Sequence, residues 1–138
     1  MEIKSFDFLT DDERMLRTAV FIEEQKFNEE FDNIDNDCHH LVLYIDSKPV
    51  ACVRYFVENN TQKYHLGRLC VLKEYRGRHL GEVLVREVEK CVKSLGGNVI
   101  VLSAQVRASG FYEKLGYKKL GDIYYDEYCE HIHMEKSF

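Results

Sequence analysis

The sequence predicts an α/β fold, of the mixed α+β kind, built on one sheet that is not symmetrically doubly wound. A chain of 138 residues can bury roughly two-thirds of its unfolded surface around one core, so we expect a single domain over residues 1–138. Strand-like and helix-like segments follow one another in the order β-α-(α)-β-β-β-α-β-α-β-β. Strands that succeed one another directly therefore share the sheet with strands joined through helices.

The N-terminal segment reads as a strand followed by a helix. Residues 3–8, IKSFDF, alternate in the way of a short strand. Thr10 and Glu13 have the spacing of a capping box, in which the threonine begins a helix. The helix that we expect next carries an apolar face made of Met15, Leu16, Ala19, Val20 and Ile22.

Three strands follow an acidic segment. Residues 28–37, NEEFDNIDND, form an acidic loop or a short helix. The runs HHLVLYI (39–45) and VACVRYF (50–56) read as a hairpin with its turn at Asp46–Pro49. A second turn, NNTQ, leads into the strand KYHLGRLCVL, residues 63–72.

The C-terminal half begins with a helix whose apolar stripe runs from Leu80 to Leu95 and which Gly96 and Gly97 close. NVIVLSA (98–104) is a continuous apolar run, which is typical of a strand buried on both faces. ASGFYEKLG (108–116) predicts a short helix. Two late strands are expected, around YKKLG and around EYCEHIHMEK.

Composition excludes several classes of function. A net charge of −5 argues against a general nucleic-acid binder, and no apolar run approaches the ~18–20 residues that cross a bilayer. The N-terminus lacks the pattern of a signal peptide, so we expect no membrane partner and a cytoplasmic location. No CxxC pair exists, and we predict neither a metal site nor a disulfide framework. The cysteines are odd in number and widely spaced: Cys38, Cys52, Cys70, Cys91 and Cys129.

The stretch CVLKEYRGRHLGEVLVREVEK, residues 70–90, concentrates positive charge just before a helix. The first N–H groups of a helix have no intrahelical partner, and the helix dipole places about half a positive charge there. Gly77 lets the backbone approach an anion, and Arg76 and Arg78 can pair with phosphate oxygens. The stretch therefore predicts a phosphate site, although a solvated surface turn explains the spacing equally well. It matches neither the Walker loop nor the glycine pattern of dinucleotide-binding folds.

Two motifs and the order of the elements resemble the GNAT family of acetyl-CoA-dependent N-acetyltransferases over essentially the whole chain. RGRHLG, Arg76–Gly81, resembles the family's [Q/R]-x-x-G-x-[G/A] pyrophosphate loop, and VLSAQVRASGFYEKLGYK resembles its second motif, a strand followed by a short helix. VFIEEQKF, EFDNIDND with HHLVLY, and EHIHMEK are further similar to the small stand-alone bacterial ElaA-like group. The resemblance implies the GNAT fold, with a mostly antiparallel central sheet that helices flank and whose strands splay apart at the cofactor site.

For the cofactor, the resemblance implies coenzyme A, with acetyl-CoA as cosubstrate. The pantetheine arm would lie between the splayed strands, and the backbone amides of the loop would hold the pyrophosphate. His79 departs from the family pattern, which has glycine there. A residue in the first helical turn can be right-handed, so we expect weaker or pH-sensitive binding rather than loss. The cofactor-binding residues implied are Leu69, Cys70, Val71, Arg76, Gly77, Arg78, His79, Leu80 and Gly81.

Tyr112, in FYEKLGY, matches the family tyrosine that acts as the acid. Acyl transfer from a thioester to an amine releases a thiolate, and a phenol with a pKa near ~10 can give it a proton. Without the resemblance, a core aromatic on the apolar face of a short helix is the better interpretation. With the resemblance, we expect Tyr112 to be the catalytic acid.

The general base stays open. An alkyl ammonium must lose a proton before its nitrogen can attack. Many family members use a glutamate on the strand before the loop, but YHLGRL offers only His65 and Arg68 there. A water chain with no dedicated base is a further alternative. The candidate side chains are Glu24, His40, His65, Asp126, Glu127 and His131.

The acceptor side is expected near the segment from Glu23 to Asp37, which holds seven carboxylates and one lysine, Lys26. This charge would attract a cationic amine such as a polyamine or a lysine-like side chain, although a solvated acidic loop explains it equally well. Asp35 and His40 can also serve folding. We therefore expect a small-molecule or peptide amine as the partner. Members of the family are often homodimers, but nothing in this chain decides the oligomeric state.

The sequence thus predicts an enzyme that transfers an acetyl group to a primary amine in a direct ternary complex. One alternative is a catalytically degenerate module that binds acyl-CoA as a sensor or partner. His79 and the missing strand glutamate favour that alternative, and the intact FYEKLGY opposes it. Another is a phosphate-binding regulatory module of a different α/β fold, which would prefer nucleotides to coenzyme A.

Overall fold

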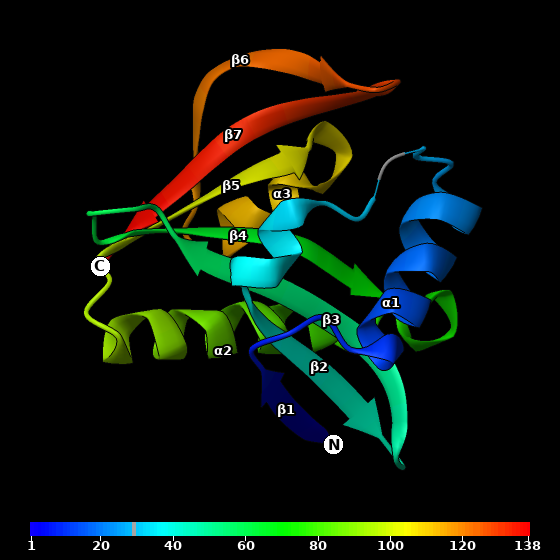
Figure 1. Ribbon diagram of the computed structural model, residues 1–138. Coiled ribbons are helices and arrows are strands. Elements are labelled where there is room, and N and C mark those ends of the chain that lie inside the picture. The colour runs from blue at the N-terminus through cyan, green and yellow to red at the C-terminus, as the bar shows by residue number, and fades with distance from the viewer. Residues whose placement is uncertain (29) are drawn as a thin grey trace.

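A computed structural model describes residues 1–28 and 30–138, and within them one seven-stranded sheet carries the fold (Figure 1). The strands lie in the order β1-β2-β3-β4-β5-β7-β6, and each neighbouring pair is antiparallel except β4 and β5. The predicted mixed sheet is therefore confirmed. The strands are β1 Glu2–Phe6, β2 His39–Ile45, β3 Lys48–Val57, β4 Lys63–Val71, β5 Val99–Gln105, β6 Lys118–Asp126 and β7 Cys129–Ser137.

Helices cover the two faces of the sheet (Figure 1). One face packs against α1, and the opposite face packs against α2 and α3. The predicted order of helices and strands is confirmed. The α-helices are α1 Asp11–Arg17, α2 Leu80–Ser94 and α3 Ser109–Lys114; the π-helix is η1 Thr18–Glu24; and the 3₁₀ turns are η2 Asn33–Asp37, η3 Lys73–Tyr75 and η4 Val106–Ala108.

Helix α1 begins as predicted, because the Thr10 side chain accepts a hydrogen bond from the Glu13 amide at 3.1 Å. Its buried face differs from the expected one. Leu16 and Val20 are buried, but the side chains beside them are Glu13 and Arg17. The expectation that Met15 is part of the apolar face is wrong: it is 51% exposed, because the ion pair between Glu13 and Arg17 takes two positions of the inner face.

The hairpin of β2 and β3 turns more tightly than predicted. Asp46 and Ser47 alone form the turn, with φ values of 49° and 67°. Such left-handed values at both positions are those of a type I′ turn, whose twist matches that of the flanking strands. Lys48 and Pro49 therefore belong to β3 rather than to the turn.

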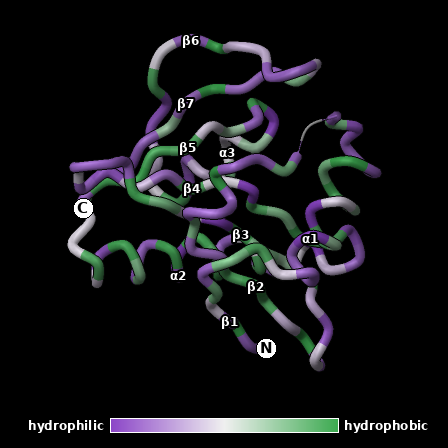
Figure 2. Tube along the Cα trace, viewed as in Figure 1, coloured by the Kyte–Doolittle hydropathy of each residue, from purple (hydrophilic) through white to green (hydrophobic). Residues whose placement is uncertain are grey.

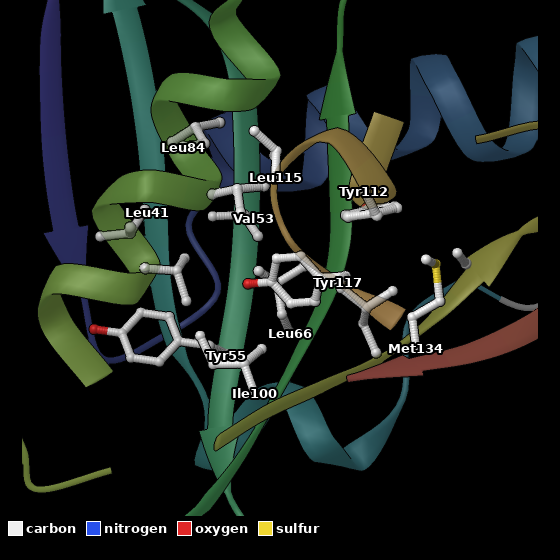
Figure 3. Close-up of a cluster of buried hydrophobic side chains, with 14 of the residues drawn as sticks. Leu41, Val53, Tyr55, Leu66, Leu84, Ile100, Tyr112, Leu115, Tyr117 and Met134 are labelled. Atoms are coloured by element: carbon white, nitrogen blue, oxygen red, sulfur yellow. The ribbon is translucent and has the colours of Figure 1, made fainter. Parts of the chain in front are cut away.

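Helix α2 supplies one side of the main core. Hydrophobic and hydrophilic residues alternate along its winding (Figure 2). Leu84 of α2 lies over Leu41 and Val53 of the sheet, and the same cluster extends to Tyr112 of α3 and Met134 of β7 (Figure 3). This packing ties α3 to the sheet and so determines where Tyr112 lies.

Strands β4 and β5 diverge at the point where the site lies. They pair in parallel only from Lys63–Leu66 to Val99–Leu102, although β4 continues to Val71 and β5 to Gln105. The implied splay is therefore present. The prediction that β5 is buried on both faces is wrong: Ser103 is exposed, because α2 and α3 cover one face of the strand while α1 packs on β3 and β4.

None of the helices in the described ranges is both long enough and apolar enough to cross a lipid bilayer.

Candidate functional site

A cavity of about 350 Å³ fills the gap between the diverging strands. One wall comes from β4 and the opposite wall from β5, and the start of α3 contributes Tyr112. A further wall comes from the end of η1 and the residues after it, including Glu24 and Gln25, and β6 and β7 contribute Asp126 and His131. Gln105 of β5 donates a hydrogen bond to Gln25 at 2.8 Å across the gap. The π-helix thus places side chains in the site, as such irregular turns often do.

Strand β4 bulges where it borders the cavity. Arg68 has a φ of 54°, and the pairing with β3 shifts register at this point. The bulge directs the Arg68 guanidinium to Glu30, at 3.0 Å. Of the three β4 residues implied for the pantetheine arm, Leu69 lines the cavity, whereas the Cys70 side chain is buried on the α1 face of the sheet.

The loop before α2 has a geometry that suits an anion. Gly77 has a φ of 80°, and no atom of the described residues lies within 4 Å of the position that a Cβ would take. No side chain in the described part of the chain caps the N-terminus of helix α2. The first-turn amides are consequently open to an outside acceptor.

His79 contradicts one expectation. It is the N-cap of α2 with φ 60° and ψ 23°, which is left-handed rather than right-handed. This explains why the family pattern has glycine at the position, since a residue without a Cβ adopts this conformation without strain. Histidine occupies it at a conformational cost.

The two arginines of the loop differ in their partners. Arg76 binds Glu24 through two hydrogen bonds, both 2.7 Å, and its Nε donates to the Val71 carbonyl. The pair with Arg76 lowers the pKa of Glu24. Arg78 lies over the Tyr75 ring at 5.0 Å, with no carboxylate partner in the described residues. The guanidinium of Arg76 is therefore engaged within the protein, and its role toward phosphate stays a prediction.

Gly81 joins the loop to α3. A Cβ at this position would lie 3.3 Å from the Phe111 ring, which is closer than ordinary packing allows. Glycine therefore lets the first turn of α2 lie against α3, next to Tyr112. The expected pyrophosphate loop and the expected catalytic helix are thus in direct contact.

Tyr112 lies in the cavity wall and is 8% exposed. Its ring meets those of Phe111 and Tyr117 edge-on, with centroids 5.0 and 5.9 Å away. Burial raises the pKa of its phenol, so the group keeps its proton at neutral pH. No residue of the described chain forms a hydrogen bond with the hydroxyl, which is free to donate to a group in the cavity.

The six candidate bases separate by position. Glu24, Asp126 and His131 line the cavity, and the other three do not. His65 is stacked on Phe56 and lies 3.5 Å from Glu58. The Glu127 carboxylate accepts hydrogen bonds from Asn28.

His40, the remaining candidate, is fully buried, and both of its ring nitrogens are in hydrogen bonds. Nδ1 lies 2.9 Å from the Glu13 carboxylate, and Nε2 lies 3.0 Å from the Asp35 carbonyl. Burial alone would lower the pKa of His40, but the hydrogen bonds to Glu13 and to the Asp35 backbone, together with the charges of these two residues, outweigh it and the pKa is raised. His40 is therefore closed to a substrate, in agreement with a role in folding.

Sequence reasoning missed the buried ionic network to which His40 belongs. At its centre is Arg17, fully buried, which binds Glu13, Glu30 and Asp35 at 2.7–2.8 Å. Arg54 of β3 also binds Asp35, at 2.9 Å. Burial alone would raise the pKa of Asp35, but the hydrogen bonds from Arg17 and Arg54 and the positive charges of these arginines together outweigh it and lower the pKa to about 2.

The network changes the interpretation of the acidic segment. Asp32 and Glu30 are paired with Arg54 and Arg68, so these carboxylates are not free to attract a substrate, although Asp32 stays in contact with solvent. The sequence carries a weak signal for this pairing, because three arginines occur in segments otherwise predicted to be buried. Glu29, which belongs to the same acidic segment, lies outside the described residues.

One buried group has metal-like spacing: the ligand atoms of Asp35, Cys38 and His40 lie within 4.8 Å of one another. The Asp35 carboxylate is shared by two arginines, and both His40 nitrogens are bonded. Burial raises the pKa of the Cys38 thiol to about 11 and keeps it protonated. These groups suit a hydrogen-bonded core better than a metal ion.

A second cavity, of about 470 Å³, adjoins the first. The two share Glu30, Arg68 and Asp126 in their walls. Its further acidic residues are Asp32 and Glu127. A substrate can therefore approach Tyr112 from a side that is separate from the loop before α2.

Comparison with known proteins places the chain among acetyltransferases. Residues 10–138 match the family described as "Acetyltransferase (GNAT) domain". A Bacillus subtilis chain that is provisionally named an acetyltransferase is 39% identical over 127 residues, which are 88% of this chain and 85% of that one. ElaA of Escherichia coli is 25% identical over 127 residues, which are 88% and 83% of the two chains.

Solved structures agree. An acyl-CoA N-acyltransferase from Pseudomonas aeruginosa superposes with a TM-score of 0.88 at 26% identity, over 99% of this chain and 100% of that one. An aminoglycoside 6'-N-acetyltransferase complexed with coenzyme A gives a TM-score of 0.77 over 99% and 97% of the chains. At 19% identity, the second likeness supports the fold alone.

Proposed function

Because the chain belongs to the GNAT family of N-acetyltransferases, we propose that it transfers the acetyl group of acetyl-CoA to a primary amine, directly and within a ternary complex. The observation that carries the proposal is the cavity between the diverging β4 and β5, into which α3 brings the buried Tyr112. The proposal also includes one domain over residues 1–138 and a cytoplasmic location, which suits the five free cysteines.

In this proposal the loop before α2 binds the pyrophosphate of coenzyme A. The amides of Gly77 to Gly81 donate to it, and Arg78 pairs with a phosphate oxygen. Arg76 can join only by releasing Glu24. The pantetheine arm runs along β4, beside the backbone of Leu69, Cys70 and Val71.

Tyr112 acts where charge develops. Acetyl-CoA supplies the thioester, and the departing sulfur becomes a thiolate when the amine attacks. The Tyr112 hydroxyl, which has no partner within the described chain, donates its proton to that sulfur. Binding both substrates next to each other contributes the remaining rate enhancement through proximity. The reaction needs no covalent enzyme intermediate.

The acceptor enters through the second cavity and is a cationic amine. Arg54 and Arg68 already pair with Asp32 and Glu30, so the negative charge left for an acceptor comes from Asp126 at the end of β6. This carboxylate favours an ammonium group over a neutral or anionic acceptor. Small diamines and lysine-like side chains fit this description.

Calorimetric titration tests the proposal. Acetyl-CoA and coenzyme A should bind in the micromolar range, whereas ATP and NAD should bind much more weakly. A panel of cationic, neutral and anionic amines, followed by thiol release, then tests turnover. Binding without turnover of any amine would favour the acyl-CoA-binding module, and absence of acetyl-CoA binding by the folded protein would reject the proposal.

A further inference from the structure

We propose that His131 is the general base of this site, with Nε2 taking the proton that the acceptor ammonium loses before its nitrogen attacks. The inference rests on the proposed function and adds the residue that the sequence left open. It is carried by the position of the ring, by the hydrogen bond that orients it and by the bonding of the rival groups.

The ring of His131 is held by one hydrogen bond and two aromatic neighbours. Nδ1 lies 3.0 Å from the Cys129 carbonyl, which can only accept, so Nδ1 carries the hydrogen. Phe27 meets the ring edge-on at 6.3 Å, and Tyr124 lies 5.9 Å away. In the neutral ring Nε2 therefore has no proton and presents its lone pair, which is the form a base requires.

Nε2 is open toward the cavity. His131 is 7% exposed and belongs to the cavity wall. No described residue forms a hydrogen bond with Nε2. In the described ranges, Arg54 Nε is the only fully buried side-chain nitrogen or oxygen atom without a hydrogen-bond partner. His131 Nε2 also lacks a partner, so it is accessible rather than fully buried. A buried ring with one accessible, unpartnered nitrogen is built to exchange a proton with a group in the cavity.

The rival groups in the cavity are less suited. Glu24 is bound to Arg76 by two hydrogen bonds, which lower its pKa and make it a weak base. Asp126 is exposed to solvent, so it can attract the ammonium but is hydrated rather than oriented. Neither is held by the backbone as His131 is.

The step balances with this base. The ammonium gives one proton to His131, and the imidazolium later releases it to solvent. The amine nitrogen forms the C–N bond as the C–S bond of the thioester breaks. Tyr112 gives its proton to the sulfur and regains one from the same nitrogen, so the products are the amide and the free thiol.

The charged groups around the ring are mixed. Asp126 and Glu30 face the cavity with negative charge, and Arg68 and Arg107 face it with positive charge. Glu24, which is paired with Arg76, also lines the cavity, and so does the phenol-bearing Tyr112. The phenol of Tyr124 lies beside the ring, and Gln105 is the uncharged partner of His131 on β5. A pH profile must therefore be read against variants of these neighbours.

The test compares His131→Gln with His133→Gln. His133 lies two residues along β7, faces the same side and also contacts the Tyr124 ring, at 4.7 Å, but it lies outside the cavity wall. With 1,5-diaminopentane and an Nα-blocked lysine amide as acceptors, we expect His131→Gln to lower kcat/KM about 100-fold at neutral pH. The loss should shrink as the pH approaches the acceptor's own pKa, and acetyl-CoA affinity should stay within about twofold. His133→Gln should match the wild type.

The outcomes separate the two proposals. Normal turnover and an unchanged pH profile in His131→Gln would overturn the base while leaving the acetyltransferase intact. If Asp126→Asn loses the pH dependence of turnover that the wild type shows while His131→Gln retains it, the general base is Asp126 instead. Absence of acetyl-CoA binding in the wild type would remove both proposals together.

A second measurement needs no acceptor. The ¹⁵N shifts of the His131 ring, assigned by comparison with His131→Gln, report which nitrogen carries the hydrogen. We expect the neutral ring to be protonated at Nδ1 and bare at Nε2. A ring protonated at Nε2 would overturn the proposal even if no amine on the panel reacts.

Discussion

Two polar regions of this molecule lie close together and differ in how their groups are bonded. In the buried ionic network, four carboxylates face three guanidinium groups and His40, and each charge has a partner. In the neighbouring cavity, Tyr112 and His131 are almost as deeply buried, yet each keeps one polar atom without a partner among the described residues. Charged groups that form ion pairs with one another hold the fold, although Arg54 Nε has no hydrogen-bond partner among the described residues. Polar atoms that are left open in the cavity wall are available for chemistry.

The largest effect of a substitution on stability is expected inside the buried ionic network. Asp35→Asn leaves Arg17 and Arg54 as buried cations with one partner fewer, which should cost about 3–5 kcal/mol of unfolding free energy. Asp37→Asn, an exposed position in the same 3₁₀ turn, should change stability by less than about 0.5 kcal/mol. Denaturant unfolding measures both. Equal stabilities of the two variants would contradict the structural role of the network.

The second prediction contrasts two adjacent tyrosines. Tyr112→Phe should lower kcat about 100-fold and leave acetyl-CoA affinity nearly unchanged, because its hydroxyl is used only as the thiolate leaves. Tyr117 donates to Glu89 at 3.0 Å inside the core, so Tyr117→Phe should cost about 1 kcal/mol of stability with little effect on turnover. Steady-state kinetics and thermal unfolding separate the two. If Tyr112→Phe loses binding and turnover alike, the acid assignment fails.

The third prediction concerns the loop arginines. Arg78→Ala should weaken coenzyme A binding about tenfold at low salt and less at high salt, because a phosphate contact is screened by ions. Arg76→Ala should have a smaller effect, since its guanidinium must first leave Glu24. Calorimetry at two ionic strengths measures this order. Losses that do not depend on salt would indicate a folding defect instead.

The smallest effect is expected at His79. His79→Gly relieves a left-handed conformation and should raise stability by about 0.5–1 kcal/mol while tightening coenzyme A binding. Asn60→Gly, at φ 60° in the turn between β3 and β4, is the matched control for conformation alone. It should leave binding unchanged. A decrease in affinity in His79→Gly would mean that the imidazole itself contacts the phosphate.

Local patterns predicted the fold well. The alternation of strands, the Thr10 cap and the stripe of α2 each depend on neighbouring residues, so the chain alone reveals them. The burial of Arg17 depends on Glu30 and Asp35, which come from a different segment, and on the absence of solvent between them. No local pattern distinguishes such an arginine from one on the surface.

The candidate site likewise contains features that a local motif predicts and features that depend on distant residues. Tyr112 and the loop before α2 were predicted because a motif marks them, and the structure brings them into contact through Gly81 and Phe111. The left-handed conformation of His79 and the pairing of Arg76 with Glu24 were not predicted, because each depends on backbone geometry or on a partner that is 52 residues away. The open Nε2 of His131 likewise depends on the turn that places the Cys129 carbonyl.

The short parallel pairing of β4 with β5 has a consequence for how the molecule assembles and fluctuates. From β1 to β4, each strand pairs with the strand that follows it in the sequence, and β6 pairs with β7 in the same way. The pairing of β4 with β5, Lys63–Leu66 with Val99–Leu102, can form only after the chain has crossed over through α2. We expect the two parts of the sheet to form first and to dock late. Amide protons where β4 pairs with β5 should then exchange with solvent through local openings that leave β2 and β3 protected. A ligand bound between the two parts of the sheet should slow exchange at this pairing more than exchange elsewhere in the sheet.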